Sequence, residues 1–230
     1  MRKIKVNSFH GFIQKIEEIS ATENLVIFRG QAFEGGLLPS IARKNSKENT
    51  TEIEKNVIDQ LQLMGASFSD VTQSNTLDLL VLAQHFGLKT RLLDWTSNPL
   101  AALWFACADR NEGDAYVYAL LADELQDKKV YTKDPFATAR TRVFQPRLNN
   151  PRIVAQHGWF TLHRYSTKAN AFVSIDVNPD TKTKLAQFRI PENMREQIVE
   201  SLERHGISKR SLFPDLEGLC LHLNWKHKLT

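Results

Sequence analysis

Glycine, proline and cysteine are all scarce in this chain. Its 230 residues include 10 Gly and 8 Pro, too few for a collagen-like or low-complexity protein. Its two cysteines, Cys107 and Cys220, form no CxxC pair and show no zinc-type spacing with histidine, so neither a disulfide framework nor a zinc site is indicated. Both lie in apolar, helix-like stretches, and we expect them to be buried free thiols in a reducing compartment.

Long hydrophobic runs and strong net charge are also missing. No apolar run approaches the ~20 residues of a membrane span. The N-terminal segment MRKIKVNSFHGF lacks the apolar core of a signal peptide, so the expected location is cytoplasmic, without a membrane partner. Lys and Arg number 30 against 26 Asp and Glu, a net charge of +4. This small excess permits an anionic ligand but is not typical of a DNA-coating protein.

Several catalytic motifs are absent as well. The sequence contains no G-x-S-x-G, no P-loop, no G-x-G-x-x-G and no H-E-x-x-H. Its seven histidines do not combine with carboxylates at metal-ligand spacing, so we expect no metal site. Serine hydrolases and metal hydrolases are therefore disfavoured. Cys107 lies mid-helix among apolar residues, which is a poor setting for a reactive thiolate.

The pattern of apolar residues predicts a single α+β domain over residues 1–230. Helices are expected at 8–20, 52–64, 77–86, 99–108, 191–205 and 216–223. Strands are expected at 25–29, 115–121, 152–155, 159–163, 171–177 and 184–190, and residues 91–95 are expected to be a strand or an extended loop. Strands without regular βαβ alternation favour the α+β class.

Three local features refine this prediction. In the stretch 52–64, the residues Ile53, Val57, Leu61 and Met64 recur at helical spacing, and Gly65 follows the expected end of the helix. Asn98 is expected to cap the next apolar helix, with Pro99 at its first position. Residues 128–150 are poorly patterned and are expected to form a long surface excursion.

The first candidate for chemistry is the segment Phe28-Arg29-Gly30-Gln31. An arginine at the end of an apolar strand is unusual for packing, and its fork of donors suits phosphate or carboxylate. Gly30 allows a ligand or another backbone to approach closely. The alternative is a structural ion pair between Arg29 and a nearby Asp or Glu.

The second candidate is a group of polar residues in the apolar stretch 83–106. Its members are Gln84, His85, Thr90, Arg91, Asp94, Thr96, Ser97 and Asn98. They could satisfy each other, with Arg91 paired to Asp94 and with Thr96 or Ser97 capping the next helix. Alternatively, they could line an anion-binding helix N-terminus, with His85 as a proton carrier.

The third candidate is the segment 151–160, PRIVAQHGWF. It repeats the tripeptide Ala-Gln-His of residues 83–85, although three residues are too few to indicate a duplication. Gln156 and His157 precede Gly158 in apolar surroundings. This polar pair is either internal hydrogen-bonding structure or the wall of a site.

Taken together, these segments resemble the FRG domain family, which is named for the motif seen here as Phe28-Arg29-Gly30. The family is described mainly as a domain of unknown function. The resemblance extends over about 20–222. It continues through 84–87 (QHFG), 90–96 (TRLLDWT), Asn98-Pro99, 152–160 (RIVAQHGWF) and 211–218 (SLFPDLEG).

A more distant resemblance is to ADP-ribosyltransferases of the Arg–Ser–Glu type. Phe28-Arg29-Gly30 is similar to their first element, and Trp95-Thr96-Ser97 with the following helix is similar to their second. This resemblance implies a mixed or antiparallel split sheet flanked by helices, with NAD as the substrate. Their third element is a glutamate on a later strand, and its place here holds Gln156. Asp94 is the nearest acid that could serve instead.

The leading hypothesis is an NAD-utilising enzyme that transfers ADP-ribose or cleaves NAD, as a toxin or a phage-defence effector. The ligand would be a nucleotide-like small molecule, and the acceptor a protein or a nucleic acid. Gln156, Asp94 and His85 would lie at the reacting centre. The ligand-binding set would be Arg29, Gly30, Gln31, Gln84, Arg91, Thr96, Ser97 and Arg152.

Two alternatives belong to other classes. One is a non-catalytic module that binds a nucleotide or nucleic acid through Arg29, Arg91 and Arg152. Its affinity for nucleic acid would fall steeply with salt. The other is a hydrolase in which His85 acts as the base and Asp94 orients it.

Overall fold

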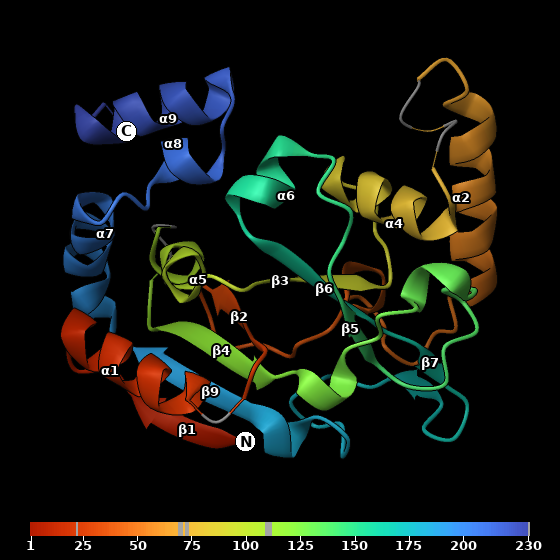
Figure 1. Ribbon diagram of the computed structural model, residues 1–230, viewed down its shortest axis with the longest axis horizontal. Coiled ribbons are helices and arrows are strands. Elements are labelled where there is room, and N and C mark those ends of the chain that lie inside the picture. Colours follow the sequence, from red (N-terminus) through yellow and green to blue (C-terminus); the bar gives the residue numbers. More distant parts are fainter. Residues whose placement is uncertain (22, 69–70, 72–73, 109–111, 230) are drawn as a thin grey trace.

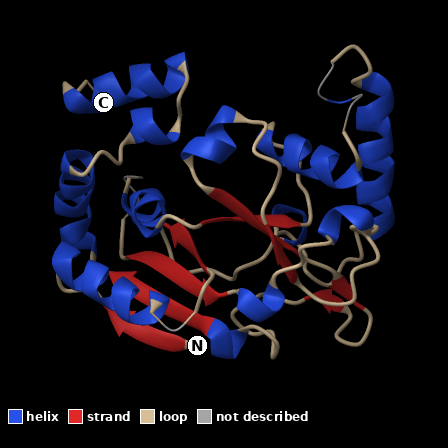
Figure 2. Cartoon of the chain, viewed as in Figure 1, coloured by secondary structure: helices blue, strands red, loops and turns tan. Residues whose placement is uncertain are grey.

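The computed structural model describes residues 1–21, 23–68, 71, 74–108 and 112–229 (Figures 1 and 2). Its α-helices are α1 (Phe9–Ser20), α2 (Thr51–Met64), α4 (Thr76–His85), α5 (Pro99–Cys107), α6 (Pro151–Ala155), α7 (Arg195–Arg204), α8 (Lys209–Leu212) and α9 (Leu216–Lys226). Its strands are β1 (Arg2–Lys5), β2 (Val26–Gln31), β3 (Leu92–Thr96), β4 (Ala115–Leu121), β5 (Arg142–Phe144), β6 (Gly158–Leu162), β7 (Tyr165–Ser166), β8 (Ala171–Phe172) and β9 (Leu185–Ile190). Short 3₁₀ turns cover Ser40–Ala42, Asp123–Leu125, Val130–Thr132, Lys182–Lys184 and Glu192–Met194.

In the described part of the chain, the strands form a mixed sheet of seven in the order β1-β9-β4-β2-β3-β6-β5. The β1–β9 pair is parallel, whereas the other neighbours are antiparallel. A separate hairpin joins β7 and β8. Helices surround the sheet in Figure 2, and the predicted α+β class is confirmed.

The sheet divides between β2 and β3. The two strands share a single residue pair, Phe28 with Thr96. By contrast, all six residues of β2 pair with β4, and all five residues of β3 pair with β6. The sheet is therefore split into a β1-β9-β4-β2 half and a β3-β6-β5 half. Beyond Phe28, the β3-facing side of β2 is open along Arg29, Gly30 and Gln31.

Helix α5 packs across β2 and forms the centre of the largest core cluster, together with α1, α7 and β9. It begins as expected, because the Asn98 side chain accepts hydrogen bonds from the N–H groups of Leu100 (3.0 Å) and Ala101 (3.3 Å), with Pro99 at the first position. A Cβ atom at position 30 would lie 2.6 Å from the backbone nitrogen of Ala106. Gly30 thus lets the backbone of α5 approach closely. A close approach of another backbone was one of the two alternatives expected for this residue, and a ligand was the other.

Most of the expected elements are confirmed, but two strand predictions are wrong. Residues 152–155 belong to the helix α6, because Asn150 caps it (Arg152 N–H to Oδ1, 2.9 Å) and Pro151 occupies its first position. Of residues 171–177 only Ala171–Phe172 is a strand. Beyond it the chain binds the segment after β2, with Ile175 donating to the carbonyl of Leu37.

The helix α2 is confirmed, but its apolar residues at helical spacing are not its most buried residues. Ile53 and Met64 are exposed, whereas Glu54 and Ile58 are buried. The carboxylate of Glu54 lies against the buried guanidinium of Arg91, with Oε2 2.7 Å from Nε. The excursion at 128–150 holds the strand β5 in addition to loops.

The two cysteines have different environments. Cys107 is buried on α5, and burial raises the pKa of its thiol to about 12. Cys220 is exposed on α9, so its expected burial is wrong. Within the described residues, no helix is long and apolar enough to cross a membrane.

This difference predicts the reactivity of the thiols. Because the thiolate is the reactive form, a thiol reagent is expected to modify Cys220 in the native protein and Cys107 only after unfolding. Titration with Ellman's reagent, with and without denaturant, measures both. A native Cys220→Ser variant should be unreactive, and rapid modification of that variant would contradict the burial of Cys107.

Candidate functional site

A cleft of about 630 Å³ opens where β2 and β3 separate. Its volume falls within the roughly 300–1,000 Å³ typical of small-molecule sites. Its walls come from β2, the segment after β2, β3, α5 and the residue that follows α6. Among the predicted site residues it gathers Arg29, Gly30, Gln31, Asp94, Thr96 and Gln156.

Arg29 lies in this cleft with its side chain 16% exposed. Its Nε donates to Oε1 of Gln31 (3.1 Å), and its Nη1 donates to the backbone oxygen of Asp94 (2.7 Å). No described residue accepts a hydrogen bond from Nη2. Burial lowers the pKa of Arg29, Asp94 opposes this shift, and the neighbouring charge of Arg43 adds to it. Arg29 therefore offers a charged, partly desolvated donor to an anion.

Asp94 supplies the negative charge of the cleft. Its side chain is 60% exposed, and Oδ2 lies 3.8 Å from Nη1 of Arg29. Oδ1 accepts a hydrogen bond from Nε2 of Gln84 (2.6 Å), and Oε1 of Gln84 accepts one from the buried hydroxyl of Thr90. This chain of hydrogen bonds orients the carboxylate. Gln84 thus acts on Asp94 and does not line the cleft itself.

The start of α5 is already capped. Thr96 lines the cleft, and its Oγ1 accepts a hydrogen bond from the N–H of Asn98 (2.9 Å). The first free N–H groups of α5 are bound by the Asn98 side chain. Ser97 is exposed, and its N–H donates to the carbonyl of His157 (3.0 Å). An anion therefore has no open helix terminus to bind here.

Gln156 follows the last residue of α6, and its side chain lines the cleft. The resemblance to ADP-ribosyltransferases implies a strand at this position, but Gln156 comes before β6. Its Nε2 donates to the backbone oxygen of Leu212 (3.1 Å), which connects α6 to α8. No described residue donates to Oε1, so this acceptor is available to a ligand hydroxyl.

Arg91 does not belong to the cleft. It is fully buried, and its Nε lies 2.7 Å from Oε2 of Glu54 on α2. The backbone N–H of Arg91 donates to Oε1 of the same carboxylate (2.7 Å), and its guanidinium lies over the ring of Phe136. The suggested pair between Arg91 and Asp94 is therefore wrong. Arg91 is thus not a ligand-binding residue of this cleft.

Arg152 is also held by protein groups. Its guanidinium donates to Oδ2 of Asp215 (2.6 Å from Nη2) and lies 5.4 Å from the ring centre of Phe213. Glu217 lies 3.5 Å from the same Nη2. These contacts connect α6 to the start of α9. Of the three arginines proposed for a binding module, Arg29 lines the cleft, whereas Arg91 is buried and Arg152 is paired with Asp215.

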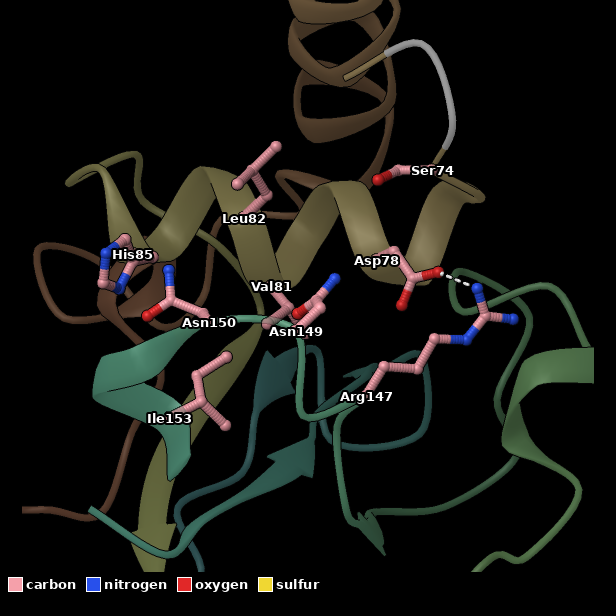
Figure 3. A pocket seen from close by; sticks show the side chains of 9 residues that line it. All are labelled: Ser74, Asp78, Val81, Leu82, His85, Arg147, Asn149, Asn150 and Ile153. Carbon is pink, nitrogen blue, oxygen red and sulfur yellow. Dashed lines mark ion pairs between the residues drawn. The ribbon is translucent and has the colours of Figure 1, made fainter. Parts of the chain in front are cut away.

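His85 lines a different pocket, of about 320 Å³, between α4 and the segment 147–153. Figure 3 shows it at one end of this pocket, with the ion pair of Asp78 and Arg147 (2.8 Å) at the other. Burial lowers the pKa of His85, and the charge of Arg152 adds to this decrease. No hydrogen bond joins His85 to Asp94 among the described residues.

The cleft also has lining residues that were not expected as site residues, among them Arg43, Phe33 and Phe105. Arg43 is an exposed second guanidinium, with its Nε donating to the carbonyl of Leu38 (3.2 Å). Phe33 is 63% exposed, and Phe105 of α5 lines the same space. A phenylalanine beside the glycines at 35 and 36 was a usable signal. Arg43 carried none, because it begins a polar stretch that resembles an ordinary surface loop.

The comparisons with known proteins come to one family. The family model of the FRG domain matches residues 24–115. This range holds Arg29, Gln84 and Asp94, whereas Gln156 lies outside it and within the longer range expected from the motifs. No curated protein and no solved structure matches the chain.

Proposed function

Because this chain contains an FRG domain, with a cleft formed largely by that domain, we propose that it binds NAD there and breaks the bond between nicotinamide and ribose. The ADP-ribosyl group would pass to water or to a protein or nucleic-acid acceptor. Consumption of NAD in this way would suit a toxin or a phage-defence effector. The observation that carries the proposal is the pairing of Arg29 with the exposed carboxylate of Asp94 in one cleft.

The charge and the aromatic rings of the cleft suit a dinucleotide. Arg29 and Arg43 supply two guanidinium groups, which bind the oxygens of a pyrophosphate through charge-assisted hydrogen bonds. Phe33 and Phe105 offer apolar ring surface to a base. The described side chains of the cleft carry one net positive charge, since Asp94 is the single carboxylate among them.

Asp94 would act on the reacting ribose. When the glycosidic bond breaks, neutral nicotinamide leaves with the bonding electron pair and positive charge develops on the ribose. The acceptor oxygen then bonds to the same carbon and loses a proton, to solvent where the acceptor is water. A nearby carboxylate stabilises the developing charge, an effect often worth about 3–4 kcal/mol. Gln156 would accept a hydrogen bond from a ribose hydroxyl through Oε1.

The test follows nicotinamide release from NAD by chromatography. Arg29→Ala is expected to abolish release, because the anchor for the pyrophosphate is lost. Asp94→Asn is expected to slow it about 100- to 1,000-fold, because the carboxylate charge is lost while the shape is kept. The matched controls are Arg210→Ala and Asp59→Asn, which change exposed residues outside the cleft. Equal activity of Asp94→Asn and the parent protein would refute the role of Asp94.

A binding module without catalysis is the second candidate. It is favoured by the contacts of Asp94, since Gln84 donates a hydrogen bond to its carboxylate and Arg29 lies close enough to form an ion pair with it. This candidate predicts NAD binding by calorimetry that Arg29→Ala removes, with no nicotinamide release by any variant. Loss of both binding and release in the folded parent protein would overturn both candidates.

A further inference from the structure

A second, more basic hollow lies at the opposite edge of the β3-β6-β5 half. It has a volume of about 530 Å³, and its lining residues adjoin β5 and β7, which are labelled in Figure 1. Three chain segments form it: the residues before β5, the β7–β8 hairpin, and the segment 173–180. None of these residues lines the NAD cleft proposed above.

Positive charge in this hollow exceeds the negative charge that lines it. Arg140, Arg164 and Lys168 line it, against one carboxylate, Asp180. No described residue forms an ion pair or a hydrogen bond with the side chain of Arg164 or Lys168, and the guanidinium of Arg140 has only the backbone oxygen of Glu124, at 3.5 Å. Arg152 and Arg91, by contrast, each contact carboxylates. Like charges in one concave site favour an anion.

The hairpin holds its lysine in a defined turn. Tyr165 pairs with Phe172 and Ser166 with Ala171, and Asn170 closes the turn with a φ of 47°. The N–H of Ala169 donates to Oγ of Ser166 (3.2 Å). The tip that carries Lys168 is therefore an ordered part of the wall.

The basic surface continues past the hairpin. The N–H of Phe172 donates to the carbonyl of Ser46 (2.8 Å), and the hydroxyl of Tyr165 donates to that of Lys47 (3.1 Å). The loop 43–51 is thus fixed alongside the hairpin, and Lys44 and Lys47 are exposed on it. The same loop begins with Arg43, which lines the NAD cleft.

We infer that this basic edge, made of Lys44, Lys47, Arg140, Arg164 and Lys168, binds a nucleic-acid strand through its phosphates. Guanidinium and ammonium groups bind phosphate oxygens, and cations placed in series suit a phosphodiester chain better than one isolated phosphate. A strand on this edge would reach Arg43 at the cleft. On the proposed NAD chemistry, which this last step alone requires, the acceptor would then be a nucleic acid.

The test measures fluorescence anisotropy of a labelled single-stranded oligonucleotide of about 20 nucleotides, without NAD, over a series of salt concentrations. The double variant Arg164→Ala/Lys168→Ala is expected to bind more weakly at about 50 mM salt. Its slope of log affinity against log salt should be shallower by about 1.4, since each lost phosphate contact to a single strand removes about 0.7.

The control is Lys15→Ala/Lys55→Ala, which removes the same charge from lysines paired with Glu18 and Glu52. It should bind as the parent protein does. Equal weakening in both doubles would mean that net charge alone acts, and would overturn the inference. So would no binding by the parent, or full competition by orthophosphate at a matched phosphate concentration. Because NAD is absent, failure of the proposed enzymatic function would leave these results unchanged.

Discussion

Glu54→Ala is expected to lower the free energy of unfolding by about 3–5 kcal/mol. The substitution removes the carboxylate that binds Arg91. Its Oε1 accepts a hydrogen bond from the backbone N–H of Arg91, and its Oε2 accepts one from Nε. Arg91 is fully buried, so it would remain as a charge without a counterion in the core. Urea unfolding followed by circular dichroism measures the change.

Glu52 provides the matched control, two residues away on the same helix. Its side chain is 78% exposed and pairs with Lys55, an arrangement worth less than about 1 kcal/mol. A double variant, Glu54→Leu with Arg91→Met, is expected to recover part of the lost free energy of unfolding, because it removes both buried charges. Burial of the Glu54 carboxylate is costly, since it raises the pKa of Glu54 in spite of Arg91. Similar effects of Glu54→Ala and Glu52→Ala would show that the buried pair is unimportant.

Gly30→Ala is expected to destabilise the protein by about 3 kcal/mol or more, at or above the upper end of typical overpacking. The new methyl group would meet the backbone of α5 at Ala106 and, closer still, the carbonyl oxygen of Ala102. Backbone atoms cannot rotate away as a side chain can, so α5 must move from β2. For a chain of this size, the melting temperature should fall by about 6–12 °C.

Gly36→Ala is the control for this prediction. Gly36 also lines the cleft, but a Cβ atom there would lie 3.5 Å from Oγ of Ser174, an ordinary contact. Its melting temperature should stay close to that of the parent protein. An unchanged melting temperature for Gly30→Ala would mean that α5 and β2 are not as close as described.

Local signals in the sequence were sufficient for most elements. Helices α1, α4 and α5 have caps or apolar spacing that few other structures would satisfy. Strand β4 is a short apolar run between turns, and β9 is mostly apolar but includes Gln187 and Arg189. The error at α6 was avoidable, since Asn150-Pro151 repeats the start seen at Asn98-Pro99. The apolar residues of 152–155 favoured a strand in spite of that signal.

Long-range partners were the harder part. The sequence indicated that Arg29 and Asp94 belong to one site, and the fold brings them into one cleft. It did not indicate that Arg91 pairs with Glu54, which is 37 residues away on the helix α2. A buried ion pair depends on tertiary contacts that no local period encodes.

The single residue pair between β2 and β3 has a consequence for how folding and ligand binding are coupled. Within the described strands, Arg29 belongs to one half of the sheet and Asp94 to the other. A molecule held by both side chains would bridge the halves where backbone hydrogen bonds are few. By linkage, a ligand present at about 100 times its Kd adds about 2.7 kcal/mol to the stability of the folded state. The occupied cleft would then act as a cross-link, and the bound molecule would become part of the protein's own architecture.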